Sequence, residues 1–255
     1  MENFVIENET SAGIMMHYFP AASRRSRGAV VIFSGGGYSH RAYHEGELYA
    51  LALNEMGIDA FWVDYRVNPD LFPAPLIDAR RSVAYLRKNC EKYDLDCDKI
   101  AVMGSSAGGH LAALVSTYKE KIDGEDENVS LCIPNAQILC YPVTDIASHR
   151  GSYEMLLGDN INMQENVNPI ALADESTPKA FIWHTSTDEY VDVKSTYRYA
   201  ARLSELGVSC EMHIYPIGTH GLGLATGDAK REPVEYVQRW PEELERWLKL
   251  IGWLN

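Results

Sequence analysis

Short apolar runs alternate with longer amphipathic stretches along this chain. The runs are rich in valine, isoleucine and aromatic residues, and they are apolar on both faces, which is typical of strands buried inside a sheet. We therefore predict strands at residues 28–34, 58–65, 99–103, 135–141, 179–184 and 208–215.

The stretches between these runs carry apolar residues at helical spacing, which predicts helices. Gly57 and Gly207 directly follow two of these stretches, in the position of a glycine that ends a helix. The predicted helices cover residues 43–56, 76–93, 107–118, 193–206 and 234–250.

Strands that alternate with helices indicate an α/β fold with a mostly parallel central sheet and helices on both faces. No repeat, low-complexity tract or linker divides the chain, so residues 1–255 are predicted to form a single domain. Residues 145–176 lack clear periodicity and interrupt the alternation of strands and helices. A small lid or substrate loop is expected there.

The charge balance narrows the range of partners. The chain has 255 residues and a formal net charge of −13. So acidic a surface argues against nucleic acid or an anionic membrane as the main partner. No segment reaches the roughly 18 apolar residues of a membrane span, and the N-terminus has no apolar stretch of signal-peptide length. These features predict a cytoplasmic protein.

The five cysteines do not form a metal-binding or disulfide pattern. No pair has the C-x-x-C spacing, and Cys132 and Cys140 lie in or beside apolar runs, as small core residues do. We therefore expect reduced thiols and no zinc site.

One motif carries a specific chemistry. Gly104, Ser106 and Gly108 match G-x-S-x-G, directly after a predicted strand and at the start of a predicted helix. This is the setting of a nucleophile elbow, in which a strained turn lifts a serine hydroxyl clear of the sheet. The motif alone is weak, and a glycine-rich turn that binds phosphate is the alternative interpretation. Ser105 replaces Ser106 only if the turn has another register.

A serine hydroxyl needs a base, and in this fold the acid and then the histidine follow the nucleophile. Of eight histidines, His220 stands in a glycine-rich loop just after the last predicted strand. His213 lies within that strand and is interpreted as a packed or surface residue. We therefore predict His220 as the base.

The acid is expected in the loop after the preceding strand, where Asp188, Glu189 and Asp192 compete. Asp192 immediately precedes a helix and is typical of an N-cap, and Glu189 is expected to face solvent. Asp188 is favoured, with the role of orienting His220 and stabilising its protonated form.

Acyl transfer also needs donors for an oxyanion. Three glycines follow the first predicted strand, and glycine allows backbone amides to approach a substrate closely. We predict the amides of Gly36, Gly37 and Ala107 as these donors. Tyr38 and Val191 are expected to shape the substrate pocket because of their positions.

A resemblance to a known family covers residues 28–225. It is carried by SGGGYSHRAYHEGELYALALNEMGIDAFWVDYRV, PAPLIDARRSVAYLR, IAVMGSSAGGHLAAL, LCYPV, IWHTSTDEYVDV and IYPIGTHGLGLA. These stretches resemble small bacterial α/β-hydrolases of the acetylxylan esterase or xylan esterase type, which are related to hormone-sensitive-lipase-like esterases. The resemblance implies the α/β-hydrolase fold and a carboxylic ester hydrolase acting on short-chain esters, often acetyl groups on sugars or xylo-oligosaccharides. Ser34 stands where the lipase-like relatives have the histidine of their His-Gly-Gly-Gly motif.

Other functions remain open at this point. The same three side chains serve an amide hydrolase, such as an arylformamidase or a small peptidase, and the fold can also be a catalytically silent ligand-binding protein. The proposed chemistry requires no metal or organic cofactor. A homo-oligomer through Trp240, Trp247 and Trp253 is possible, although aromatic residues on a terminal helix more often pack on their own core.

Overall fold

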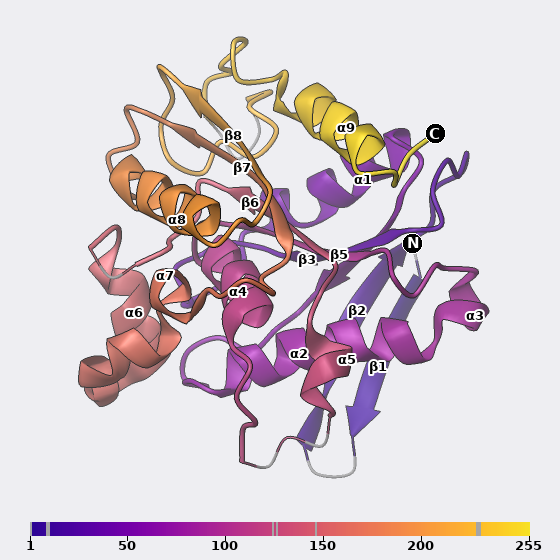
Figure 1. Ribbon diagram of the computed structural model, residues 1–255, viewed down its shortest axis with the longest axis horizontal. Helices are drawn as coiled ribbons and strands as arrows, with labels where there is room; N and C mark the ends of the chain where they lie inside the picture. The colour runs from indigo at the N-terminus through magenta and orange to yellow at the C-terminus, as the bar shows by residue number, and fades with distance from the viewer. Residues whose placement is uncertain (1, 9–10, 124, 126, 146, 228–230) are drawn as a thin grey trace.

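The fold is built around one sheet. The computed structural model describes residues 2–8, 11–123, 125, 127–145, 147–227 and 231–255. Within these residues eight strands form one sheet, in the order β1-β2-β4-β3-β5-β6-β7-β8 (Figure 1). The strands are β1 (Glu2–Asn8), β2 (Ser11–Phe19), β3 (Ala29–Phe33), β4 (Asp59–Val63), β5 (Ile100–Ser105), β6 (Ala136–Cys140), β7 (Lys179–Thr185) and β8 (Cys210–Tyr215).

Strands β3 to β8 run parallel to one another, and the hairpin of β1 and β2 adds antiparallel strands at the edge beside β4. The prediction of a mostly parallel sheet is therefore confirmed, together with its six strands. The N-terminal hairpin was not predicted.

The helices connect the strands and cover both faces of the sheet. They are η1 (Tyr43–Glu45), α1 (Glu47–Glu55), α2 (Ala74–Lys88), α3 (Cys90–Tyr93), α4 (Ser106–Thr117), α5 (Val129–Cys132), α6 (Arg150–Leu157), η2 (Gly158–Val167), α7 (Pro169–Leu172), α8 (Val193–Glu205) and α9 (Trp240–Leu250).

Two apolar clusters form the core, one on each face of the sheet. Neighbouring residues of β3 point to opposite faces, so Val31 packs in one cluster with Leu111 of α4, and Val30 packs in the other with Leu244 of α9. Figure 1 shows α2, α4 and α8 over one face, and α1 and α9 over the other. This double cover explains why the central strands are apolar on both sides.

Three predicted helices differ from the structure. The last helix begins at Trp240 rather than at residue 234, with Pro241 in its first turn. A proline deep inside a helix clashes with the preceding turn, so the helix cannot extend that far back. The helix predicted over 76–93 is divided at Asn89, and the helix predicted over 43–56 is divided at Gly46 into η1 and α1. Residues 145–176 hold the helical segments α6, η2 and α7, although residue 146 of this range lies outside the described residues.

The expectation that all five thiols are reduced is wrong for two of them. Cys90 and Cys97 form a disulfide, with their Cα atoms 5.7 Å apart. The chain turns back after α3 and brings the two residues together, although they lack a recognised spacing. Cys132 and Cys140 are free and buried in the core, as predicted.

The three C-terminal tryptophans are buried within their own chain, with Trp240 and Trp247 in α9 and Trp253 just after it. They therefore pack in the core of their own chain, which was the more common expectation for aromatic residues on a terminal helix. Among the helices of the described residues, none has both the length and the apolar character needed to cross a membrane.

Candidate active site

Ser106 lies in a sharp turn between β5 and α4, with a positive φ of 53°. The turn is possible because two glycines flank it. A Cβ atom on Gly104 would lie 2.1 Å from the carbonyl oxygen of Gly108, and one on Gly108 would lie 2.1 Å from that of Phe33. Both approaches are too close for any side chain, so the spacing of the motif is a packing requirement of the turn.

Three side chains that are far apart in the sequence form one hydrogen-bonded chain. The Nε2 atom of His220 lies 2.8 Å from Oγ of Ser106, and its Nδ1 lies 2.7 Å from Oδ2 of Asp188. The loops after β5, β7 and β8 supply these residues. Because parallel strands end at the same edge of a sheet, the three loops meet there. The arrangement can remove a proton from the serine hydroxyl.

The carboxylate of Asp188 is fully buried and held in place by several donors. Its Oδ1 atom accepts hydrogen bonds from the amides of Tyr190 and Val191, both at 2.9 Å. Burial alone would raise the pKa of Asp188, but hydrogen bonds from His184 and His220 hold that pKa well below its usual range. The group is therefore a carboxylate at neutral pH. Glu189 is exposed.

Asp192, the other competitor, accepts a hydrogen bond from the amide of Lys194 at 3.0 Å and caps α8. This is the N-cap role predicted for it. In the part of the chain that the structure describes, its carboxylate contacts Lys194 and forms no hydrogen bond or ion pair with His220. Ser105 is equally remote from the chemistry, because it is buried and its hydroxyl donates to Tyr49.

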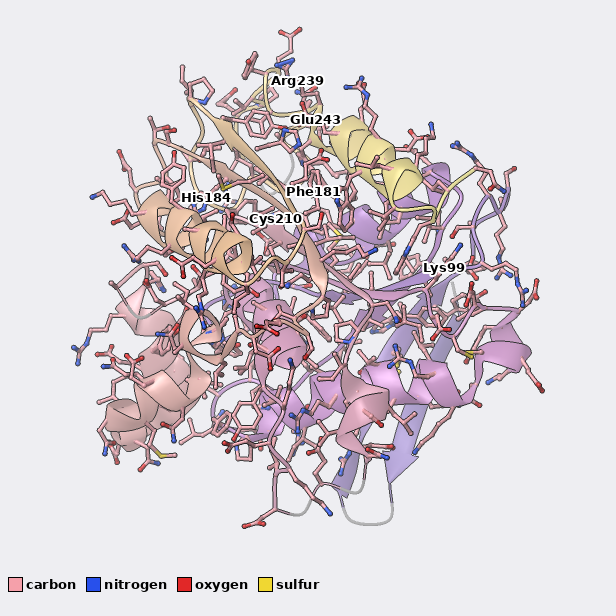
Figure 2. All side chains as sticks on the ribbon, in the orientation of Figure 1. Lys99, Phe181, His184, Cys210, Arg239 and Glu243 are labelled. Carbon is pink, nitrogen blue, oxygen red and sulfur yellow. A yellow bond between two sulfur atoms is a disulfide. The ribbon has the colours of Figure 1, made fainter. Side chains whose placement is uncertain are left out.

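His184 is a functional residue that the sequence did not identify. It is the last residue but one of β7, and its buried Nε2 atom lies 3.1 Å from Oδ2 of Asp188. Its Nδ1 atom lies 2.8 Å from the hydroxyl of Thr196 in α8. In Figure 2, His184 lies close to α8, further along β7 than Phe181. The one signal for His184 in the sequence is its position four residues before the predicted acid, Asp188.

The loop after β3 provides two amides beside the serine. Gly36 has a φ of 126° and Gly37 a φ of 63°, which glycine adopts most readily. Both line the cleft that contains Ser106. Ala107 is in the first turn of α4, where the amides of a helix lack partners and the helix dipole favours negative charge. Gly36 and Gly37 thus share the cleft with Ser106, and Ala107 directly follows the serine in α4.

Glu45 connects the glycine loop after β3 to the loop that carries His220. This buried carboxylate accepts the amide of Gly35 at 2.8 Å through Oε2 and the hydroxyl of Tyr141 at 2.7 Å through Oε1. The same hydroxyl accepts the amide of Gly223, in the loop that carries the histidine, at 2.9 Å. Glu45 therefore joins the glycine loop to the histidine loop. Sequence reasoning missed it because no motif marks the contact.

His110 ties α4 to the helical segment at 145–176. Its Nε2 atom lies 2.8 Å from the carbonyl oxygen of Val167, so Nε2 carries the proton and Nδ1 accepts the hydroxyl of Tyr38 at 2.7 Å. Burial lowers the pKa of His110 to about 4, against the opposing effect of the Val167 carbonyl. The imidazole is therefore neutral at physiological pH.

The site opens into a cleft of about 460 Å³. Tyr38 and Val191 were expected to line it, but each side chain is only 1% exposed and both pack behind the wall. The backbone of Tyr38, with a φ of 60°, turns the side chain inward. The cleft is lined by Gly36, Gly37, His40, Arg41, Ala42, Tyr43, His44, Glu45, Ser106, His149, Tyr190, His220, Gly221 and Arg231.

Among the residues that the structure describes, no group of three or more histidine, cysteine or acidic side chains is arranged to hold a metal ion. The arrangement at Ser106 brings a hydroxyl, an imidazole and a carboxylate within hydrogen-bonding distance of one another.

The sequence matches one family model and is similar to two proteins of known name. The BD-FAE family model matches residues 15–203. Endo-1,4-beta-xylanase B of Butyrivibrio fibrisolvens is 33% identical over 79% of this chain, and an acetylxylan esterase of Xylanibacter ruminicola is 30% identical over 88%. The chain spans only 33% and 45% of these two proteins.

One solved structure matches this chain from end to end in fold. The acetyl ester-xyloside bifunctional hydrolase of Caldicellulosiruptor lactoaceticus is 36% identical, with a TM-score of 0.89. The match covers 100% of this chain and 97% of that one. The α/β-hydrolase fold expected from the sequence is thus confirmed.

Proposed function

Because this chain belongs to the BD-FAE family of α/β-hydrolases, we propose that it is a serine esterase that hydrolyses short-chain carboxylic esters. The observation that carries the proposal is the unbroken hydrogen-bonded chain from Ser106 through His220 to Asp188, with distances of 2.8 and 2.7 Å. These distances are those of a nucleophile, a base and the group that orients the base.

Acylation begins when Oγ of Ser106 attacks the ester carbonyl and Nε2 of His220 takes the hydroxyl proton. The carbonyl oxygen becomes an oxyanion, which accepts hydrogen bonds from the amides of Gly36, Gly37 and Ala107. The carbon–oxygen bond to the alcohol then breaks. His220 returns its proton to the leaving alcohol oxygen, and the acyl group stays on the serine.

Deacylation repeats these steps with water. His220 takes a proton from the water as its oxygen attacks the acyl carbon, and the carboxylic acid leaves when the proton returns to Ser106. Asp188 stays ionised throughout. Its low pKa supports this role, because a carboxylate that held a proton could not stabilise the imidazolium.

We propose that residues 145–176 form one wall of the substrate site within a single domain. His149 from this segment lines the cleft, and the bond from His110 to Val167 anchors the segment to the helix that follows the nucleophile. A lid held in this way would shape the pocket without covering the serine.

The favoured substrates are acetyl esters of sugars or xylo-oligosaccharides. Three similar proteins are named for acetyl esters, xylan or xylosides. Side chains with hydrogen-bonding groups line much of the cleft, which suits the hydroxyl groups of a sugar. No additional partner is needed for this activity.

The test is a panel of 4-nitrophenyl esters from acetyl to octanoyl, with acetylated xylo-oligosaccharides and matched anilides. We expect the acetyl ester and the acetylated sugars to be hydrolysed fastest and the anilides to react far more slowly. Ser106→Ala should lose several orders of magnitude in kcat, by roughly 10⁴-fold or more.

Other outcomes would redirect the proposal. Faster cleavage of the anilides would indicate an amide hydrolase. An enzyme that turns over no member of the panel and resists a fluorophosphonate probe would be a ligand-binding protein. Equal activity of Ser106→Ala and the natural chain would rule out a serine mechanism.

A further inference from the structure

Two arginines line the cleft, and their surroundings differ. Arg41 is engaged: its Nη1 donates to the carbonyl of Tyr65 at 2.8 Å, and its Nε lies 3.3 Å from Oδ1 of Asp64. Arg231 donates from Nε to the carbonyl oxygen of His220 at 3.0 Å. Among the described residues, no carboxylate forms an ion pair with it. Its two terminal nitrogens therefore retain donors for a ligand.

The backbone of the histidine loop fixes the position of this guanidinium. A Cβ atom on Gly221 would lie 2.7 Å from Nη2 of Arg231 and 3.1 Å from its Cζ. Glycine at this position therefore permits the guanidinium to pack against the loop, directly after the proposed base His220. Arg231 is thus a cation held beside the reacting centre.

The remaining charges of the cleft do not cancel this cation. The carboxylate of Glu45 is buried and already accepts the Gly35 amide and the Tyr141 hydroxyl. The charged cleft residues are two arginines and this one glutamate, a formal charge of +1 in a chain whose total is −13. Arg41 is paired with Asp64, and Asp188 lies behind His220, so Arg231 is the lining cation that has no carboxylate partner among the described residues, which points to an anionic ligand.

A neutral donor faces the same cleft. His149 accepts the amide of Ser152 at 3.1 Å through Nδ1, which leaves Nε2 as the protonated nitrogen. Burial lowers the pKa of His149, and the nearby His220 lowers it further. The imidazole can thus donate one hydrogen bond without carrying charge. Both His149 and Arg231 therefore favour a ligand rich in acceptors.

The mechanism decides which part of the substrate meets Arg231. His220 returns its proton to the leaving alcohol, so the alcohol must lie beside the imidazole, whereas the acyl oxygen faces Gly36 and Gly37. Arg231 is hydrogen-bonded to the carbonyl oxygen of His220 and lines the same cleft, which favours contact with the alcohol part of the ester.

We propose that Arg231 binds a carboxylate on the alcohol part of the ester, so that the enzyme prefers esters of acidic sugars, such as oligosaccharides bearing a uronic acid. This inference rests on the esterase function proposed above. A guanidinium with two free terminal nitrogens matches a carboxylate in geometry as well as in charge.

The test compares two aryl acetates of nearly equal shape. 4-Acetoxybenzoate carries a carboxylate on its leaving group, and 4-acetoxybenzamide carries a neutral amide. The readout is the ratio of the two kcat/KM values within each variant, because a general loss of activity cancels in that ratio. We expect the ratio to fall roughly tenfold in Arg231→Gln, which corresponds to about 1.4 kcal/mol, and to be partly retained in Arg231→Lys.

Arg41→Gln is the matched control, and it should keep the ratio of the natural chain. Inhibition of the natural chain by 4-hydroxybenzoate and 4-hydroxybenzamide gives a second measure that needs no variant, and the benzoate should bind more tightly. An unchanged ratio in Arg231→Gln, or equal inhibition by both compounds, would overturn the inference. If neither acetate is hydrolysed at all, it is the esterase function that fails.

Discussion

The Nε2 atom of His184 lies 3.1 Å from Oδ2 of Asp188, the same oxygen that faces His220 at 2.7 Å. The acid of the proposed triad therefore sits between two imidazoles. His184 comes from β7, which leads into the loop of Asp188, and His220 comes from the loop after β8. The first contact fixes the carboxylate so that the second can orient the base.

The contact with His184 should contribute to catalysis. His184→Phe removes a buried hydrogen bond to a charged group, and such bonds contribute about 1.5–3 kcal/mol. We expect kcat/KM on 4-nitrophenyl acetate to fall by roughly 10- to 100-fold. Thr196→Val is the control, because it removes only the outer hydrogen bond, and its effect should be smaller. Equal activity of His184→Phe and the natural chain would show that the acid needs no second support.

Two neighbouring aspartates should differ sharply in their effects. Asp188→Asn leaves the fold intact but removes the charge that stabilises the protonated His220, and kcat should fall by roughly 10³–10⁴-fold. Asp192→Asn keeps an N-cap for α8, so its kcat should stay near that of the natural chain. Steady-state kinetics on both variants decide the matter. Similar losses in the two would contradict the assignment of the acid.

Glu45 should affect turnover more than substrate binding. In Glu45→Gln the amide nitrogen replaces one oxygen, so either the Gly35 amide or the Tyr141 hydroxyl loses its acceptor. The glycine loop and the histidine loop would then be less well aligned, and we expect kcat to fall roughly tenfold or more with KM little changed. The hydroxyl of Tyr49 lies 3.1 Å from that of Tyr141, at the remote end of the same network, so Tyr49→Phe should have a milder effect. A variant that changes KM alone would argue for substrate contact instead.

His110 should make the protein sensitive to mild acid. Its pKa is lowered to about 4 by burial, whereas an unfolded histidine titrates near pH 6.5. Between these values the unfolded chain binds a proton that the native state excludes, so this histidine's contribution to the free energy of unfolding is full above about pH 6.5 and falls as the pH drops towards 4, by up to about 1.4 kcal/mol per pH unit.

Urea unfolding at pH 7, 6 and 5 measures this dependence. His110→Gln cannot take up a proton, so its free energy of unfolding should depend less steeply on pH than that of the natural chain. Identical slopes in the two proteins would mean that His110 makes no such contribution.

Local patterns predicted much of the fold and part of the site. The six central strands follow from runs that are apolar on both faces, and the elbow at Ser106 follows from two glycines that no other residue can replace. Chain order and loop position led to His220 and Asp188, because parallel strands bring successive loops to one edge. The structure brings these three side chains together.

Features that depend on distant contacts could not be predicted. Glu45 acts through Tyr141, which is 96 residues away in the sequence, and the disulfide joins cysteines of no recognised spacing. Tyr38 and Val191 occupy the expected backbone positions, but a position near the site does not fix the direction of a side chain. The predicted cytoplasmic localisation and the possible oligomer remain predictions from the sequence.

The most direct test of the central claim is to label the protein with a fluorophosphonate and locate the adduct by mass spectrometry of its peptides. We expect one adduct, on Ser106, with loss of esterase activity in proportion to labelling and a much slower reaction in His220→Ala. An adduct on Ser105, or esterase activity that survives complete labelling of Ser106, would contradict it.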